Sequence, residues 1–511
     1  MNDSAEDRAG ARRLVSGVFW NALGRGLPLL LALALTPLLV QQMGLERWGL
    51  FTLALALVGV FGIFDLGIGP ALTRGLSERM AQGADGGEDA DAGRLVGTAM
   101  LALGGFAAIG AAVLWAVLPW LMRSALNVPP ELQQEALVAF RILACAAPLI
   151  VLNAALWGVL AAHQRFAAAN LATIPVAVMY YLGPVILLAF WQSLIGVMLV
   201  LVACRLANTL SYLWLARPVL PRLSVGSPAL VLPLLRIGGW MTFASVLNQA
   251  LLYADRFLIG AMLTLAAVAY YATPLDLVLR MWILPVAISQ ALLPAMASAF
   301  RTLPAVTAGL LRRGALMMVV LTLPPCLVLA GVGDAVLGLW LGADFAAGGG
   351  MVLRILAAGI FFSCLAHAPN ALIDAIGRPD ATAKFIAIQV AVFLPLSALM
   401  LWWGGIEGAA IAWAIRAAAD CAGKLYLAGR LYPAAADSAR QLRWPLALAG
   451  VALMAMVLAP EWRSAAAIAA LGFTAVLASL LRVLTAEERA TLRPLLRRPW
   501  QVRRMLRSPV A

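Results

Sequence analysis

Long apolar segments follow one another along almost the whole chain, separated by short polar loops. A helix that crosses a bilayer needs about 20 mainly apolar residues. That length predicts fourteen spans, with both ends of the chain on the same side of the membrane. The spans cover residues 14–40, 48–72, 95–121, 137–161, 169–190, 194–216, 235–263, 268–293, 310–332, 351–376, 384–403, 406–428, 444–459 and 465–484.

The composition supports a membrane protein. Of the 511 residues, 63% are hydrophobic and 12% are charged, and the mean hydropathy is +0.92. Soluble proteins have about 45–50% apolar and about 25% charged residues, so lipid is the solvent for most of this chain. We predict an all-α integral membrane protein with about fourteen transmembrane helices.

The net charge of +13 comes from arginines that lie mainly in the loops and the C-terminal tail. Cytoplasmic loops of membrane proteins are enriched in basic residues. With the N-terminus in the cytoplasm, 27 basic residues fall in cytoplasmic segments and 3 in outer loops. We therefore predict a multi-pass protein of the bacterial inner membrane with both termini in the cytoplasm. Topology explains the charge, and no nucleic-acid partner is expected.

Weak sequence similarities relate the end of span 6 to the end of span 12, and the loop before span 5 to the loop before span 11. The similar segments lie 211–213 residues apart. They predict two related six-helix lobes, which suits a transporter that binds cargo between repeated bundles. The predicted parts are a cytoplasmic N-terminus (1–13), an N-lobe (14–216), a linker (217–234), a C-lobe (235–428), an added helix pair (444–484) and a basic cytoplasmic tail (485–511). The tail is read as a topology anchor on membrane lipid.

Four arginines lie near the middle of predicted spans: Arg25, Arg205, Arg280 and Arg416. Each costs about 3 kcal/mol at a helix centre, so such groups face a bundle interior or a wet cavity. One interpretation is that they pair with acids as links between helices, as Asp276 with Arg280 and Asp420 with Arg416. The other is that they line one cavity and bind an anionic cargo such as a pyrophosphate, which a guanidinium holds with two hydrogen bonds.

Acidic residues in or near the spans are candidates for coupling or gating. They include Asp65, Asp255 and Asp276, and Arg256 lies beside Asp255. Asp255 with Arg256, and Asp374 with Arg378, are also spaced to neutralise one another. An unpaired acid is suited to carry H⁺ or Na⁺. The five cysteines stand singly and the two histidines lie far apart, so no metal site or other cofactor is expected.

Several short motifs resemble those of one transporter family. Residues 43–51 (MGLERWGLF) resemble the "LG…YG" turn of bacterial oligosaccharide flippases, and residues 64–69 (FDLGIG) resemble the "DLG" segment that closes their second span. Residues 253–260 (YADRFLIG), 269–272 (AYYA) and 376–379 (IGRP) resemble later motifs of the same family. In this order the motifs cover about residues 15 to 430. The chain is identified as a member of the polysaccharide-transporter (Wzx-type) branch of the multidrug/oligosaccharidyl-lipid/polysaccharide flippase superfamily.

This resemblance implies a two-lobed helical fold that moves undecaprenyl-pyrophosphate-linked oligosaccharide units from the cytoplasmic to the periplasmic leaflet by alternating access. The product would be O-antigen, exopolysaccharide or capsule, with a polymerase and a chain-length regulator as possible partners. Many members have twelve spans, and the lipid II flippases of the superfamily have fourteen. A lipid II flippase and a multidrug exporter are therefore the alternatives, although a pump for cationic drugs would favour buried acids over buried arginines.

Enzymes form the alternative class. A polytopic glycosyltransferase or an O-antigen polymerase needs a sizeable outer loop that carries catalytic residues, whereas the longest outer loops here, near 122–136 and 333–350, are short. We expect no catalytic residues. An ATP-driven pump needs Gly-Lys followed by Ser or Thr, and Gly423-Lys424 is followed by Leu425 inside a span.

Overall fold

The computed structural model of the protein describes residues 3–61, 88–163, 165–220, 231–459 and 461–483, with Thr73 and Leu76. Helices make up nearly all of these residues, and the described ranges contain no strand. Ten of the described helical stretches are long and apolar enough to cross a bilayer. The predicted all-α membrane fold is confirmed, whereas the count of fourteen spans stays a prediction.

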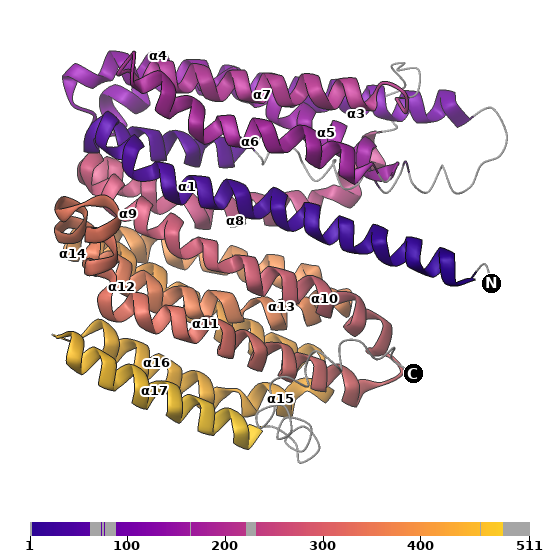
Figure 1. Ribbon diagram of the computed structural model, residues 1–511, viewed down its shortest axis with the longest axis vertical. Coiled ribbons are helices and arrows are strands. Elements are labelled where there is room, and N and C mark those ends of the chain that lie inside the picture. The colour runs from indigo at the N-terminus through magenta and orange to yellow at the C-terminus, as the bar shows by residue number, and fades with distance from the viewer. Residues whose placement is uncertain are drawn as a thin grey trace. The chain divides into compact units, whose positions relative to one another are not determined.

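Up to Met262, the structure describes seven helices with their bounds, of which α1 holds two predicted spans (Figure 1). They are α1 (Asp3–Phe61), α3 (Glu88–Trp120), α4 (Pro130–Ala144), α5 (Ala147–Ala162), α6 (Phe166–Leu188), α7 (Leu194–Ala216) and α8 (Val231–Met262). A π-helical turn, Leu121–Ala125, extends α3.

From Leu265 to Val483, the structure describes nine further α-helices, several of them interrupted. They are α9 (Leu265–Leu279), α10 (Ile283–Ala299), α11 (Pro304–Leu341), α12 (Ala343–Leu365), α13 (His367–Ala375), α14 (Pro379–Leu431), α15 (Ala436–Gln441), α16 (Arg443–Val457) and α17 (Trp462–Val483). A 3₁₀ turn, Arg280–Trp282, separates α9 from α10, and a second one, Pro433–Ala435, precedes α15.

Glycines divide the two longest helices where the sequence predicts loops between spans. Gly44 in α1 has φ 75° and ψ 166°, and Gly405 in α14 has φ 58° and ψ −147°. Residues with a Cβ rarely adopt such angles. Each of these helices is therefore two helices joined across a sharp kink, in agreement with the predicted breaks at 40–48 and 403–406.

The chain divides into two compact units. Unit 1 contains Met1–Thr273, Gly338–Gly348 and Ala383–Ala409, and unit 2 contains Pro274–Leu337, Gly349–Thr382 and Ala410–Ala511. In unit 1, α1 packs on α6 and α8, and α7 packs on α4, α5 and α6. In unit 2, α10 packs on α13, and α16 packs on α17. The boundaries of these units fall inside α9, α11, α12 and α14, and not between the predicted lobes. The two six-helix lobes and the added pair therefore stay a prediction.

Within unit 1, a tightly packed junction joins α1 to α8 and α9. An ideal Cβ on Gly49 would lie 2.1 Å from the Leu265 carbonyl oxygen, so only glycine permits this approach of two backbones. The neighbouring Trp48 is buried, and its Nε1 donates a hydrogen bond of 2.8 Å to the Thr273 hydroxyl. The motif at residues 43–51 therefore serves to pack α1 closely against α9.

Candidate functional site

Of the four arginines predicted to bind cargo, Arg205 lies in unit 1. It projects half-buried from α7, with its guanidinium carbon 5.4 Å from the centre of the Tyr180 ring on α6. Within the described residues it forms no ion pair. An aromatic face stabilises a cation without neutralising it, so Arg205 keeps its full charge at this place in the helix bundle. The sequence analysis missed Tyr180, because its partner lies 25 residues further along the chain.

Arg416 has a similar setting in unit 2. It is half-buried on α14, and its guanidinium carbon lies 5.4 Å from the centre of the fully buried Trp413 ring. Asp420, the acid predicted to pair with Arg416, forms an ion pair with Lys424 at 3.0 Å. Arg416 and Asp420 each make further contacts, so their predicted pairing stays a prediction.

Arg280 and Arg25 complete the predicted set. Arg280 begins the 3₁₀ turn between α9 and α10, is exposed, and forms no ion pair within the described part of the chain. Arg25 belongs to α1, but its side chain lies outside the described residues. The structure thus places Arg205 in one unit and Arg280 and Arg416 in the other, and a cavity common to all four stays a prediction.

The predicted coupling and gating residues differ in their surroundings. Asp255 and Arg256 are fully buried on α8 in unit 1. The Asp255 carboxylate accepts hydrogen bonds from the Tyr271 hydroxyl and from the Arg256 backbone N–H. The guanidinium carbon of Arg256 lies 5.4 Å from the centre of the Tyr253 ring. These residues come from the motifs at 253–260 and 269–272, which therefore meet in one polar cluster.

The structure describes less about the other two coupling candidates, Asp276 and Asp65. Asp276 is half-buried on α9, and Asp65 lies outside the described residues. The predicted neutralisation of Asp374 by Arg378 is wrong, since Arg378 pairs with Asp380 at 3.0 Å. The reason is that α13 ends at Ala375 and Gly377 turns the chain with φ 76°. The spacing of four residues therefore no longer places the two side chains on one helix face.

Unit 2 contains a polar cluster that the sequence did not reveal, at the break between α12 and α13. His367 follows this break, and its Nδ1–H donates to the Ser363 carbonyl at 3.1 Å. The Trp282 indole, which ends the 3₁₀ turn, donates to the Ser363 hydroxyl at 3.1 Å and contacts the His367 ring. Ser289 donates to the His367 carbonyl at 3.3 Å. Interrupted spans of this kind are tolerated where protein groups satisfy the freed backbone.

The ion pair between Asp420 and Lys424 belongs to the same cluster. Both side chains are about 13–14% exposed, and their charges act on His367. Lys424 also attracts the charge of Asp374, which accepts a hydrogen bond of 2.8 Å from Asn370. Two carboxylates, one ammonium and one imidazole thus lie close together on α13 and α14.

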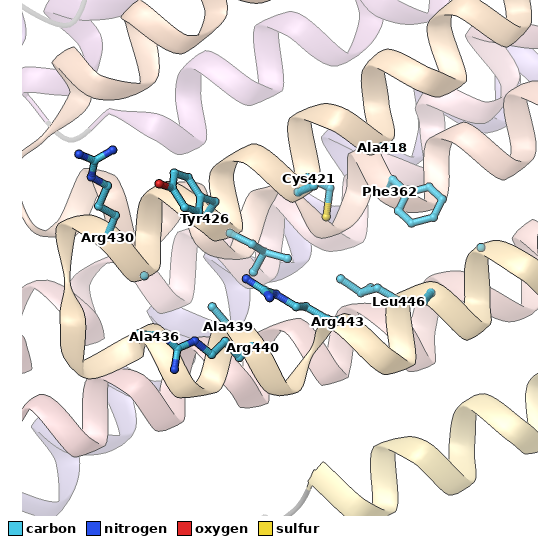
Figure 2. A pocket seen from close by; sticks show the side chains of 15 residues that line it. Phe362, Ala418, Cys421, Tyr426, Arg430, Ala436, Ala439, Arg440, Arg443 and Leu446 are labelled. Carbon is cyan, nitrogen blue, oxygen red and sulfur yellow. The ribbon is translucent and has the colours of Figure 1, made fainter.

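A cavity of about 680 Å³ lies elsewhere in unit 2, among α12, α14, α15 and α16 (Figure 2). Of the predicted cargo arginines whose side chains the structure describes, none lines it. Its basic residues are Arg430, Arg440 and Arg443, which the sequence analysis assigned to topology alone.

Comparison with solved structures defines the class of the fold. The structure is similar to the lipid II flippase MurJ in an inward closed conformation, with a TM-score of 0.70, 12% identity, and coverage of 92% of this chain and 99% of that chain. It is also similar to a multidrug resistance MATE family transporter of the MOP superfamily in an inward-facing conformation, with a TM-score of 0.65, 13% identity, and coverage of 82% and 99%. The fold of the chain is thus similar to that of these two transporters.

Sequence comparison then gives the family. Residues 14–300 match the model of the family described as "Polysaccharide biosynthesis protein". The chain is 26% identical over 410 residues to a protein of Shigella flexneri named "Putative O-antigen transporter", covering 80% of this chain and 96% of that protein. Since the family model covers more than half of the chain, the protein belongs to this polysaccharide biosynthesis family.

Proposed function

We propose that the protein is a Wzx-type flippase, which moves undecaprenyl-pyrophosphate-linked oligosaccharide units across the bacterial inner membrane. The observation that carries this proposal is the match to the Shigella flexneri protein over nearly its full length. The family match and the MOP-type fold agree with it. The chain acts as a transporter and not as an enzyme.

The arginines supply a way to hold such a cargo. Arg205 rests on Tyr180 and Arg416 on Trp413, each half-buried inside a long apolar helix. An aromatic face stabilises a guanidinium without neutralising it, and the planar fork of the group suits a phosphate oxygen pair. We propose that both arginines bind the pyrophosphate of the cargo, and that Arg25 and Arg280 belong to the same path.

Complementation tests this proposal. A bacterial strain that lacks its own O-antigen flippase should regain surface polysaccharide when it expresses this chain. Charge removal in Arg205→Gln and Arg416→Gln should abolish the export while the protein still reaches the membrane. Arg141→Gln is the matched control, because Arg141 lies 5.2 Å over Trp115 near a predicted outer interface. Equal export by all three variants would show that the arginines are structural.

The alternatives have their own readouts. A lipid II flippase should restore growth to cells depleted of that activity, and a multidrug exporter should raise drug resistance. We expect neither effect from this chain. Either effect, without any restored polysaccharide, would reassign the cargo.

We further propose that H⁺ drives the transport through the polar cluster of unit 2. Lys424 pairs with Asp420 and is also attracted to Asp374, so a proton taken up by this cluster would change the partner of Lys424. A proton that changes this pairing at a helix break would shift the equilibrium between two conformations of the protein. Asp420→Asn should therefore remove the dependence of transport on a pH gradient. A dependence on a Na⁺ gradient that persists in this variant would contradict the proposal.

A further inference from the structure

The cavity in unit 2 has one apolar half and one cationic half. Phe362, Leu425 and Leu446 line the apolar half, together with alanines and Gly450. Arg430, Arg440 and Arg443 lie around the rest of it. Figure 2 shows Arg430 and Arg440 at one end, Phe362 at the other, and the Arg443 side chain entering the space between α14 and α16.

The arginines are poorly neutralised by the protein. Within the described chain, neither Arg430 nor Arg443 forms a hydrogen bond or an ion pair. Arg440 pairs with Asp437 at 3.4 Å, but these side chains are 69% and 83% exposed, and exposed pairs contribute little. Three arginines and one aspartate leave a net charge of about +2 around an apolar cavity, so the site favours an anion joined to an apolar chain.

The surrounding side chains place this site at a membrane interface. Trp444, which follows Arg443, is 77% exposed, and Tyr426, about one helical turn before Arg430, is 59% exposed. Trp and Tyr gather at the level of the lipid headgroups. Further along α16, Val451 and Met454 are also largely exposed, as lipid-facing apolar residues are. By the excess of arginines, this interface belongs to the cytoplasmic leaflet.

We propose that the cavity binds a bilayer phospholipid with an anionic headgroup, of the phosphatidylglycerol type. Arg443 holds the headgroup phosphate, Arg430 adds a second positive charge at the end of the cavity, and one acyl chain lies against Phe362, Leu425 and Leu446. A volume of about 680 Å³ is in the range of small-molecule sites, about 300–1,000 Å³. The lipid would join α14, α15 and α16, and this role is separate from cargo transport.

Binding of three lipids to the purified full-length protein tests the proposal. The probes are phosphatidylglycerol, zwitterionic phosphatidylcholine and undecaprenyl phosphate, read out by native mass spectrometry and by the melting temperature in detergent. We expect phosphatidylglycerol to bind most tightly and to raise the melting temperature. The double variant Arg430→Gln/Arg443→Gln should bind phosphatidylglycerol at least about tenfold more weakly, since two positive charges near the headgroup are removed. Arg217→Gln, an exposed basic residue at the end of α7, should bind like the wild type.

A second variant tests the apolar half without touching an arginine. Ala447→Phe fills the cavity from α16, and it should weaken phosphatidylglycerol binding while the protein still folds. Equal binding of phosphatidylglycerol and phosphatidylcholine would overturn the proposal, as would full affinity in both cavity variants. Preferential binding of undecaprenyl phosphate would also overturn it, by making the cavity a site for the cargo lipid.

Discussion

Arg354 joins three helices of unit 2 through backbone carbonyl groups, and its removal should loosen α16. From α12, the guanidinium donates hydrogen bonds to the carbonyls of Ala330 at 2.9 Å, Met456 at 2.9 Å and Ala459 at 2.8 Å. Ala330 lies two residues before the break of α11 at Val332. The other two carbonyls lie at the end of α16 and just beyond it, and that of Met456 also accepts the Ala459 backbone N–H at 3.2 Å.

The magnitude follows from these bonds. Hydrogen bonds to a charged group contribute about 1.5–3 kcal/mol each, so three of them give at least about 4.5 kcal/mol. Arg354 is only half-buried, and water can replace part of this contribution. We therefore expect Arg354→Met to lower the local stability of α16 by about 2–4 kcal/mol.

Hydrogen exchange measured by mass spectrometry can detect this local change. A loss of about 2–4 kcal/mol corresponds to exchange about 30- to 1,000-fold faster in α16 and α17. Exchange in α6 and α7, which belong to unit 1, should stay as in the wild type. Arg354→Lys, which keeps the charge but loses the planar fork, should fall between the two. Arg123→Met, which removes an exposed arginine, is the control. Unchanged exchange in α16 of Arg354→Met would refute the reasoning.

Other predictions concern close approaches and kinks, and each has a glycine as its control. Gly49→Ala places a Cβ 2.1 Å from the Leu265 carbonyl oxygen, so it should cost about 1–3 kcal/mol and lower the melting temperature. Gly104→Ala, which meets nothing within 4 Å, should leave it unchanged. Gly405→Ala, at φ 58°, should also cost about 1–3 kcal/mol, whereas Gly404→Ala should be tolerated. Equal melting temperatures within either pair would contradict these assignments.

The sequence predicted the helices well, because a bilayer sets the length of the apolar segments and the distribution of charge in the loops between them. Even the kinks at Gly44 and Gly405 fall where loops between spans were expected. Pairings were harder to predict. Spacing indicated Arg378 for Asp374, but Gly377 turns the chain between them and Arg378 pairs with Asp380 at 3.0 Å.

Contacts between distant segments left no signal in a single sequence. Arg354 binds carbonyls 24, 102 and 105 residues away, and backbone acceptors have no residue type that a sequence could reveal. The His367 cluster depends on a helix break and on Trp282, 85 residues earlier. The cationic cavity was overlooked for another reason: Arg430, Arg440 and Arg443 fit the topology pattern so well that they required no further explanation.

Transport in proteoliposomes tests the central claim most directly. The purified protein would be reconstituted with a fluorescent undecaprenyl-pyrophosphate oligosaccharide, and its appearance in the opposite leaflet would be followed by a membrane-impermeant quencher. We predict movement with the wild type and with Arg141→Gln, and none with Arg205→Gln or Arg416→Gln. Failure of the folded wild type to move this lipid, under an imposed pH or Na⁺ gradient, would contradict the account.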